Sequence, residues 1–282
     1  MSTQDRDYIV SFHPLIRGDR FFWERAALGP EVICAIRKAK AVILPQTVSR
    51  ELYFLCRSLC PRVFPNYDIR FKWEGKLGDT MLFWTFGVPH PRTIIFPRVE
   101  TLVGNHPQMG SRPKLPDFPF VIKGAHGGEG QQTWLIEDKD DLSQALQLLE
   151  RLEWQGIFGF VIQKFIPGLE RDLRVTVIGN QIHSYWRINP SGFHKNIAQG
   201  GEIDHDSDPW LQKLGRQMVR QLCQQTGINL AGFDLVFPDA NEPMFLEVNY
   251  TFGRSGLGGS DGFYRILQKE VDAWLKRINT VG

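Results

Sequence analysis

The chain has 282 residues, of which 42% are hydrophobic and 23% are charged, as is usual for a globular protein. These values exclude a disordered chain, a collagen-like repeat and a small disulfide-rich scaffold. The formal net charge is only +2, so no strong field favours nucleic acid or a membrane surface as a partner.

The cysteines and the first residues predict a reducing, cytoplasmic setting. The four cysteines include no Cys-x-x-Cys pair and no metal-ligand spacing, so we expect buried, reduced thiols. The first ten residues carry Asp5, Arg6 and Asp7, which does not fit a secretory signal. The apolar runs are too short to span a bilayer, so we expect no membrane partner.

The first 90 residues alternate short apolar runs with helical stretches. This alternation favours an α/β module with a parallel sheet. Strands are predicted at residues 8–12 and 41–44, and helices at residues 30–40, 47–59 and 77–86. The Pro- and Gly-rich stretch 104–119 is predicted to be a loop.

The rest of the chain falls into a central and a C-terminal part. The central part is predicted to hold strands at 118–123, 133–136 and 158–163 and an amphipathic helix at 140–153. The C-terminal part begins with a hairpin of strands 173–178 and 182–187, turned by Gly179-Asn180. After it we expect a helix that Asp208 caps and Gly227 ends, strands at 233–237 and 244–248, a glycine-rich loop at 253–262 and a last helix at 263–278. We therefore expect three units, at residues 1–90, 91–165 and 166–282.

A glycine-rich loop follows the strand that ends at Lys123. Gly127, Gly128 and Gly130 would let main-chain N–H groups approach phosphate oxygens, and Lys123 could add a positive charge. No Gly-Lys-Ser/Thr closes the loop and no helix follows, so it is not a P-loop. A hairpin loop with glycines for turn geometry is the alternative.

Asp234 and Glu247 lie on neighbouring predicted strands whose other side chains are apolar. Alternation of side chains would place both carboxylates, with Asn249, on one face of a sheet. Such a set suits a hard cation bound through oxygen, which would also compensate the buried charges. Solvent-facing acids at a strand edge are the alternative.

Charged residues also lie on both arms of the predicted hairpin. Asp172 and Arg174 lie on one arm and Arg187 on the other, where the arginines could bind a phosphate or a carboxylate. An exposed hairpin with salt bridges is the alternative.

These pieces, in this order, resemble the ATP-grasp superfamily, in the branch related to ribosomal-protein glutamate ligases (RimK-like). The stretch from Lys76 to Gly87, followed by Val-Pro-His-Pro, is similar to that branch's helix and strand entry. The segment ending at Lys123 with its glycine loop looks like the lid, and the later motifs continue the match over about residues 70–260. Residues 1–69 match no substrate domain, and Gln163 stands where the family often has an acid.

The resemblance implies an ATP-grasp fold with an N-terminal α/β domain, a central lid subdomain and a C-terminal antiparallel-sheet subdomain. The implied activity is an ATP-dependent carboxylate–amine ligase that forms an amide through an acyl phosphate and releases ADP and phosphate. Its substrates would be small-molecule or peptide carboxylates and amines, and its cofactors ATP and Mg²⁺, with Mn²⁺ as a substitute.

The resemblance also implies roles for individual residues. Lys76, Lys123 and the lid glycines would bind phosphates, and Arg174 would belong to the nucleotide site. The adenine hinge would be Gln163, Lys164, Phe165 and Ile166, and the ribose would be bound by Glu170 or Asp172. Asp234, Glu247 and Asn249 would hold the metal, Arg187, Lys123 and Asn196 would be catalytic, and Arg254, Ser255 and Gly256 would bind substrate.

Two other functions stay open at this point. The first is a non-catalytic Mg-ATP-binding module on the same fold. The second is a serine hydrolase, because residues 258–262 match Gly-x-Ser-x-Gly around Ser260 and lead into a helix. A hydrolase elbow needs a strand directly before the serine, and here a glycine-rich loop precedes it.

Overall fold

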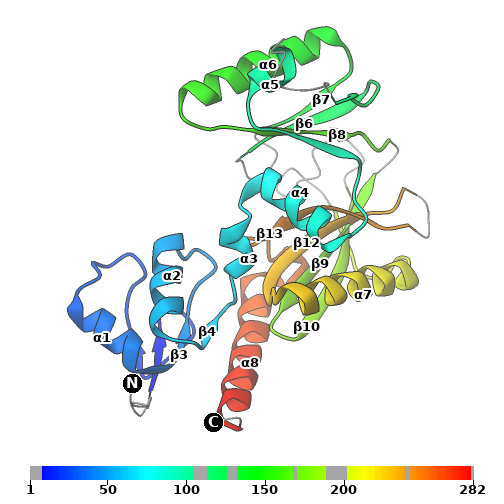
Figure 1. The fold of residues 1–282 in the computed structure, drawn as a ribbon. Helices are drawn as coiled ribbons and strands as arrows, with labels where there is room; N and C mark the ends of the chain where they lie inside the picture. Colours follow the sequence, from blue (N-terminus) through cyan, green and yellow to red (C-terminus); the bar gives the residue numbers. More distant parts are fainter. Residues whose placement is uncertain are drawn as a thin grey trace.

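The computed structural model describes residues 8–104, 113–125, 132–167, 170–188, 202–238 and 242–280. In these ranges the chain forms three four- or five-stranded sheets with helices packed against them (Figure 1). Two sheets are antiparallel and one is parallel, which confirms the mixed α/β class expected from the sequence.

The N-terminal sheet is entirely parallel, with strand order β2-β1-β3-β4. Its elements are β1 (Tyr8–Ser11), β2 (Arg20–Phe21), α1 (Pro30–Lys38), β3 (Ala39–Ile43), α2 (Arg50–Leu59) and β4 (Val63–Phe64). The predicted parallel module is confirmed. β2 and β4 have two residues each, which is too short for a periodic pattern to reveal.

Two helices connect this module to the lid sheet, whose strand order is β5-β8-β6-β7. The elements are α3 (Asp68–Lys72), α4 (Gly75–Phe86), β5 (Thr93–Phe96), α5 (Val99–Val103), β6 (Phe120–Gly124), β7 (Thr133–Ile136), α6 (Lys139–Trp154) and β8 (Phe160–Lys164). Helices α5 and α6 cover the lid sheet at the top of Figure 1 and share a separate apolar core with it.

The C-terminal sheet is antiparallel, with strand order β11-β10-β9-β12-β13. Its elements are β9 (Arg171–Ile178), β10 (Gln181–Ile188), β11 (Glu202–Asp204), α7 (Pro209–Thr226), β12 (Leu230–Val236), β13 (Met244–Asn249), a 3-10 turn (Ser255–Leu257) and α8 (Gly259–Thr280). The predicted hairpin is confirmed as β9 and β10. The predicted loop 253–262 is wrong in its last part, because α8 begins at Gly259.

The start of α7 differs from the predicted cap. Asp208 precedes the helix, as expected, but its side chain makes no capping hydrogen bond. Its carboxylate instead pairs with the guanidinium of Arg171, and its backbone takes a left-handed φ of 47°. The ion pair with the neighbouring strand therefore replaces the local cap.

Helix α8 joins the N-terminal module to the C-terminal sheet. Phe263, Leu267 and Val271 of α8 belong to the same apolar core as Val42 of β3 and Leu230 of β12. This packing sets the N-terminal module beside the residues that follow β13.

The cysteines are thiols outside any disulfide, as expected, in the part of the chain that the structure describes. Cys56 and Cys60 are buried, whereas Cys34 on α1 is exposed, which corrects the expectation that all are buried. None of the helices in the same ranges combines the length and apolar character needed to cross a membrane.

Glu270 on α8 stabilises the turn between β9 and β10. Its buried carboxylate accepts hydrogen bonds from the Asn180 N–H (2.8 Å) and from the Gln181 amide (2.9 Å). Glu270→Ala leaves the Asn180 N–H without this acceptor and is expected to lower the free energy of unfolding by about 1–3 kcal/mol. Urea unfolding checks this, with exposed Lys269→Ala as control; equal midpoints for the two variants would contradict it.

Candidate active site

The predicted carboxylate pair meets on one face of the C-terminal sheet. Asp234 of β12 and Glu247 of β13 are direct register partners, which confirms that they share a face. The Asn249 amide donates to Asp234 Oδ2 at 3.0 Å and to Glu247 Oε1 at 2.7 Å. Two carboxylates and one amide are thus gathered around one point.

Two arginines from the hairpin already compensate much of this negative charge. Arg174 of β9 donates to both oxygens of Asp234, with Nη2 at 3.0 Å from Oδ2. Arg187 of β10 lies 2.9 Å from Asp234 Oδ2 and forms a two-bond pair with Asp172, at 2.7 and 2.9 Å. A cation was expected to compensate the buried charge of this pair, and for Asp234 the guanidinium groups of Arg174 and Arg187 do so within the chain.

The electrostatics of these groups are strongly coupled. Burial opposes the charge of Arg187, but Asp234 and Asp172 outweigh it and raise the pKa of Arg187. Burial likewise favours a neutral Glu247, yet Lys76 and Lys123 hold its pKa well below the usual range. Arg187 and Glu247 are therefore both charged near neutral pH.

Lys76 links the lid to this cluster. It lies in the first turn of α4, where its ammonium contacts Glu247 Oε2 and its main-chain N–H donates to Ala125 O of the lid at 3.1 Å. Burial alone would lower the pKa of Lys76, but Glu247 and Asp79 raise it. Lys76 is thus a fixed positive charge at the boundary of two subdomains.

Lys123 stands near the end of β6, next to the same carboxylates. It is half-buried, and burial together with the charge of Lys76 lowers its pKa to about 8, against the pull of Glu247. Its ammonium is therefore protonated at pH 7 and loses its proton as the pH rises above 8.

This pKa gives the site a pH dependence if Lys123 neutralises phosphate. We expect the affinity for a phosphorylated ligand to fall above pH 8, by up to about tenfold per pH unit, because the charge is lost there. Binding titrations from pH 6.5 to 10 check this. Lys123→Arg should move the fall to higher pH, since a guanidinium stays charged; an unchanged fall in Lys123→Met would assign it to another group.

Asp79 is a site residue that the sequence analysis missed. It lies on α4, is 8% exposed and accepts a hydrogen bond from the main-chain N–H of Val248, between Glu247 and Asn249. Burial raises the pKa of Asp79 to about 7 against the pull of Lys76. Its position three residues after Lys76, on the same helix face, was the available signal.

The predicted adenine hinge follows the end of β8. The Gln163 side chain is buried and donates to Thr93 Oγ1 at 3.0 Å. Because the side chain is occupied in this way, Gln163 can contact a ligand through its main-chain groups. Lys164, the last residue of β8, is exposed, and Phe165 and Ile166 follow it half-buried. Beyond them, Glu170 is exposed, whereas Asp172 is held by Arg187.

Arg254 lies at the junction with the N-terminal module. Its guanidinium donates to Gln46 Oε1 at 3.3 Å and to Ser260 Oγ at 3.5 Å, and it lies over the Phe263 ring. His13, also buried there, has its pKa lowered to about 4 by burial and then by Arg254. Of the other predicted substrate residues, Ser255 is exposed and Gly256 is buried against Tyr185.

Some predicted residues are not placed in this cluster. Gly127, Gly128, Gly130 and Asn196 lie outside the described residues. Ser260 lies in the first turn of α8 after a 3-10 turn, not directly after a strand, and its hydrogen-bond partner is Arg254. This position lacks the strand that a hydrolase elbow requires.

The donor set fits a hard divalent cation. Among the described residues no group of three or more His, Cys, Asp and Glu side chains is arranged to hold a metal. Asp234 and Glu247 are two acids joined by an amide, and the shared bonds of Asn249 bring their oxygens around one point. Carboxylate oxygens are ligands that Mg²⁺ prefers, and the Asn249 amide, which donates its N–H groups to both carboxylates, would turn to offer its oxygen.

Solved structures define the class of protein to which this architecture belongs. D-alanine–D-alanine ligase from Bacillus anthracis complexed with ATP has a TM-score of 0.61 at 16% identity, covering 89% of this chain and 84% of that one. A RimK domain ATP-grasp protein from Sphaerobacter thermophilus DSM 20745 has a TM-score of 0.61 at 15% identity, covering 94% and 99%. The fold is therefore the ATP-grasp fold.

Sequence comparison identifies the family within this class. The family model of the RimK-like ATP-grasp domain matches residues 88–263, more than half of the chain, so the chain belongs to the RimK-like ATP-grasp family. Human β-citrylglutamate synthase B is 29% identical over 180 residues, which cover 61% of this chain and 44% of that protein. The chain thus spans less than half the length of that relative, and the resemblance inferred from the motifs is confirmed.

Proposed function

We propose that this chain is an ATP-dependent carboxylate–amine ligase that forms an amide through an acyl phosphate and releases ADP and phosphate. The observation that carries the proposal is the Asp234–Glu247–Asn249 cluster on the C-terminal sheet, facing Lys76 and Lys123 from the lid side. Carboxylate oxygens beside several fixed cations suit a phosphorylated nucleotide together with a metal.

The nucleotide would lie between the lid sheet and the C-terminal sheet. Main-chain groups of residues 163–166 would hold adenine, and Lys76, Lys123 and the lid glycines the phosphates. Glu170 is the better ribose ligand of the two candidates, because the Asp172 carboxylate is buried and held by Arg187. Arg174 would act through Asp234, which it fixes with two hydrogen bonds.

Asp234, Glu247 and Asn249 would hold Mg²⁺, for which Mn²⁺ could substitute. When bound, the metal would offset phosphate charge and orient the transferring group. The Lys76 ammonium contacts Glu247 Oε2. For this oxygen to bind the metal, the ammonium would turn from the carboxylate toward the phosphates.

The protein's own groups would act by position and charge. The substrate carboxylate attacks the γ-phosphate, and ADP leaves; an amine then attacks the acyl carbon, and phosphate leaves. Arg187 would stabilise the negative charge that develops in both steps, and Asn196 would assist on the substrate side. Little covalent chemistry is required of the enzyme, since phosphoryl transfer depends on positioning and charge.

The substrates proposed are a small acidic molecule or a peptide and an amine. Arg254, Ser255 and Gly256 would bind the carboxylate substrate at the junction with the N-terminal module, near His13. The name β-citrylglutamate synthase describes a relative whose product carries several carboxylates, which supports an acidic substrate here. We also propose that the protein works in the cytoplasm, where ATP and reduced thiols are available.

Arg254→Ala tests the substrate assignment. We expect the KM for the carboxylate substrate to rise by about 10–100-fold, since a charged hydrogen bond contributes about 1.5–3 kcal/mol, with the KM for ATP almost unchanged. Steady-state kinetics check this, with exposed Arg265→Ala on α8 as control. A rise in the KM for ATP alone would place Arg254 in the nucleotide site instead.

The function itself is tested in two stages. Thermal melts with ATP, with and without Mg²⁺, should show a Mg²⁺-dependent shift of a few degrees at saturating ligand. A screen of carboxylates and amines for ADP release should then reveal turnover. A shift without ADP release for any pair would favour the non-catalytic nucleotide-binding alternative, and no shift with any nucleotide would refute both.

A further inference from the structure

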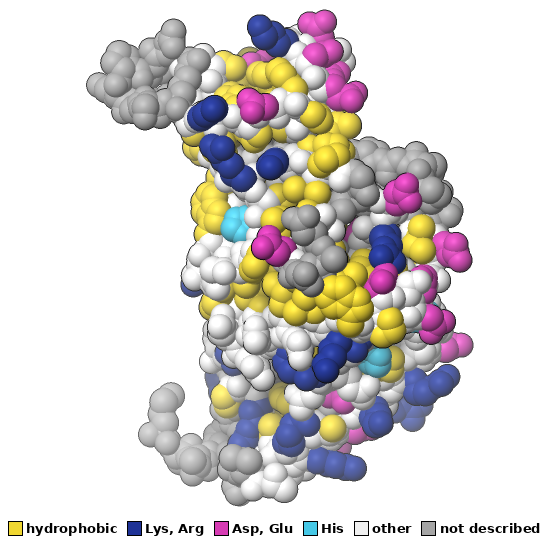
Figure 2. Space-filling model, turned by 90° about the vertical axis from the view of Figure 1, so that its right-hand side faces the viewer, with side chains coloured by type: hydrophobic (Ala, Val, Ile, Leu, Met, Phe, Trp, Pro, Cys, Tyr) yellow, Lys and Arg dark blue, Asp and Glu magenta, His cyan; other side chains and the backbone are white. Residues whose placement is uncertain are grey.

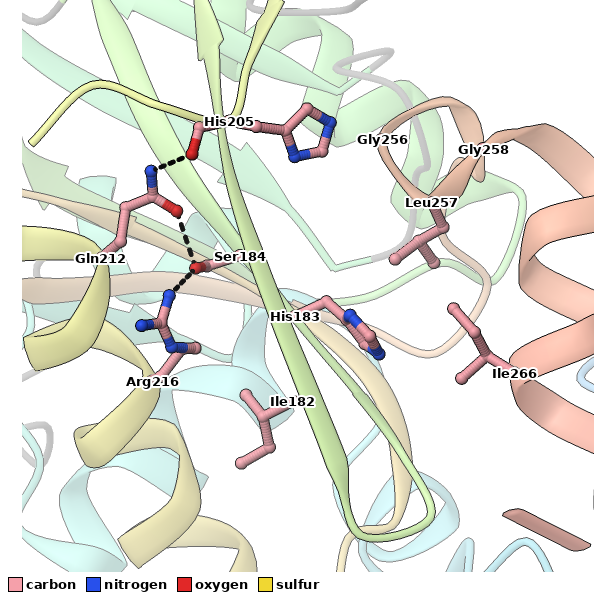
Figure 3. Close-up of a pocket in the computed structure, with 10 residues that line it drawn as sticks. All are labelled: Ile182, His183, Ser184, His205, Gln212, Arg216, Gly256, Leu257, Gly258 and Ile266. Carbon is pink, nitrogen blue, oxygen red and sulfur yellow. Dashed lines mark hydrogen bonds between the residues drawn. The ribbon is translucent and has the colours of Figure 1, made fainter. Parts of the chain in front are cut away.

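A cavity lies along the edge of β10, apart from the carboxylate cluster (Figure 3). Its volume is about 510 Å³, within the range of small-molecule sites. Strand β11 pairs only with Trp186–Ile188, so among the described residues no strand covers the edge of β10 from Gln181 to Tyr185. Helix α7 forms one wall, and the 3-10 turn with α8 forms the other.

The α7 wall carries a positive charge fixed by an ordered chain of hydrogen bonds. Arg216 donates to Ser184 Oγ at 2.6 Å, and Ser184 donates to Gln212 Oε1 at 2.8 Å. The Gln212 amide in turn donates to the main-chain oxygen of His205 at 2.8 Å. Arg216 lines the cavity and spends one N–H on this chain; with respect to the described residues, its other N–H groups are left for a ligand.

No carboxylate neutralises this arginine among the residues that the structure describes. Arg216 forms none of the ion pairs within 4 Å found there, and no Asp or Glu lines the cavity. Residues 189–201, which join β10 to β11, contain no Asp or Glu in their sequence either. On the face drawn in Figure 2, basic side chains are numerous in the lower half, with some acidic side chains among them.

The opposite side of the strand edge offers imidazole groups. His183 points toward α8, and its buried Nε2 finds no hydrogen-bond partner in the described part of the chain. The His205 ring lies above the strand edge against Tyr185, with 5.6 Å between ring centroids. Glu270 is close to His183, but its carboxylate is occupied by the turn at Asn180.

The cavity is separated from the nucleotide cluster. Tyr185 and Arg187 lie on the same face of β10 as His183, so Tyr185 stands between the cavity and Arg187. The Tyr185 ring is 2% exposed and packs so closely on Gly256 that a Cβ there would overlap it. This contact forms a wall between the two sites.

We propose that this cavity is a second ligand site that binds a small di- or tricarboxylate. Arg216 pairs with one carboxylate of the ligand, and His183 and His205 bind another. The volume of the cavity exceeds what a single phosphate fills. Arg216 and the histidines lie on opposite sides of the β10 edge, so a ligand with two separated carboxylates can reach both. The cavity shares Gly256 with the proposed substrate residues but holds none of the proposed catalytic or metal-binding groups, so the proposal concerns binding and does not depend on ligase activity.

Isothermal titration calorimetry of the full chain with citrate, glutamate and inorganic phosphate tests the proposal. We expect saturable binding of citrate or glutamate that Arg216→Gln weakens at least tenfold. Arg220→Gln is the matched control, because Arg220 is exposed one turn further along α7. Binding should persist in the presence of Mg-ATP, in Glu247→Gln and in Arg254→Ala, which separates this site from the proposed nucleotide site and from the proposed substrate site.

Three results would overturn the proposal: no saturable carboxylate binding, equal loss in Arg216→Gln and Arg220→Gln, or displacement of the carboxylate by ATP. Binding of phosphate alone would also refute the carboxylate assignment. If Arg216→Gln unfolds, His205→Ala provides the second test. It removes the ring and keeps the main-chain oxygen that Gln212 needs.

Discussion

Glu247→Gln is expected to lower the rate of ADP release by at least about 10³-fold while the protein stays folded. The substitution keeps the shape of the side chain, and its one remaining oxygen can still accept a hydrogen bond from Lys76 or from Asn249. It removes one of the two negative charges proposed to hold the metal, whose action on a phosphoryl group is worth several kcal/mol. Each 1.4 kcal/mol is a tenfold change in rate.

Two measurements separate this effect from unfolding. The Mg²⁺-dependent part of the ATP-induced thermal shift should disappear in Glu247→Gln, while the melting temperature without ligand stays close to that of the wild type. Glu242→Gln is the matched control, because Glu242 is an exposed acid just before β13. Normal turnover in Glu247→Gln would refute the metal assignment.

Asp234→Ala is expected to have the largest effect on stability, lowering the free energy of unfolding by about 3–5 kcal/mol. Asp234 is 2% exposed. Its carboxylate accepts hydrogen bonds from Arg174 and Asn249 and forms an ion pair with Arg187. Removal would leave the buried guanidinium of Arg174 without its partner, which is the costly way to break a buried ion pair.

The double variant Asp234→Leu with Arg174→Met distinguishes this cause from loss of packing. Replacing both charged partners with apolar groups should recover much of the lost stability, because no unpaired guanidinium remains from this pair. The double variant should still be inactive as a ligase. Urea unfolding of the single and double variants decides the matter, and a double variant no more stable than Asp234→Ala would contradict the electrostatic explanation.

The sequence predicts the pairing of Asp234 with Glu247 because adjacent strands with alternating side chains leave little freedom. It does not predict the Arg174–Asp234 pair, since this depends on β9 lying next to β12, and strand order is a property of the whole sheet. Asp79 was missed for a related reason. Its contact with Val248 joins a helix to a strand that follows some 170 residues later, and no local pattern contains that information.

The local sequence predicts the structure correctly where a residue has one available role, and wrongly where it has several. Gly227 ends α7 in a left-handed conformation, as expected for a glycine at that position. Asp208 was expected to cap the same helix, but Arg171 on β9 binds its carboxylate instead. The unit boundaries at residues 90 and 165 and the roles of Gly127 and Asn196 stay predictions.

The packing of α8 against the N-terminal module has a consequence for how the molecule folds. Because residues from β3, β12 and α8 share one core, the first and last parts of the chain unfold together, and neither is a separable cooperative unit. The lid sheet has an apolar core of its own. A substitution that empties the lid core should therefore leave the shared core of β3, β12 and α8 in place.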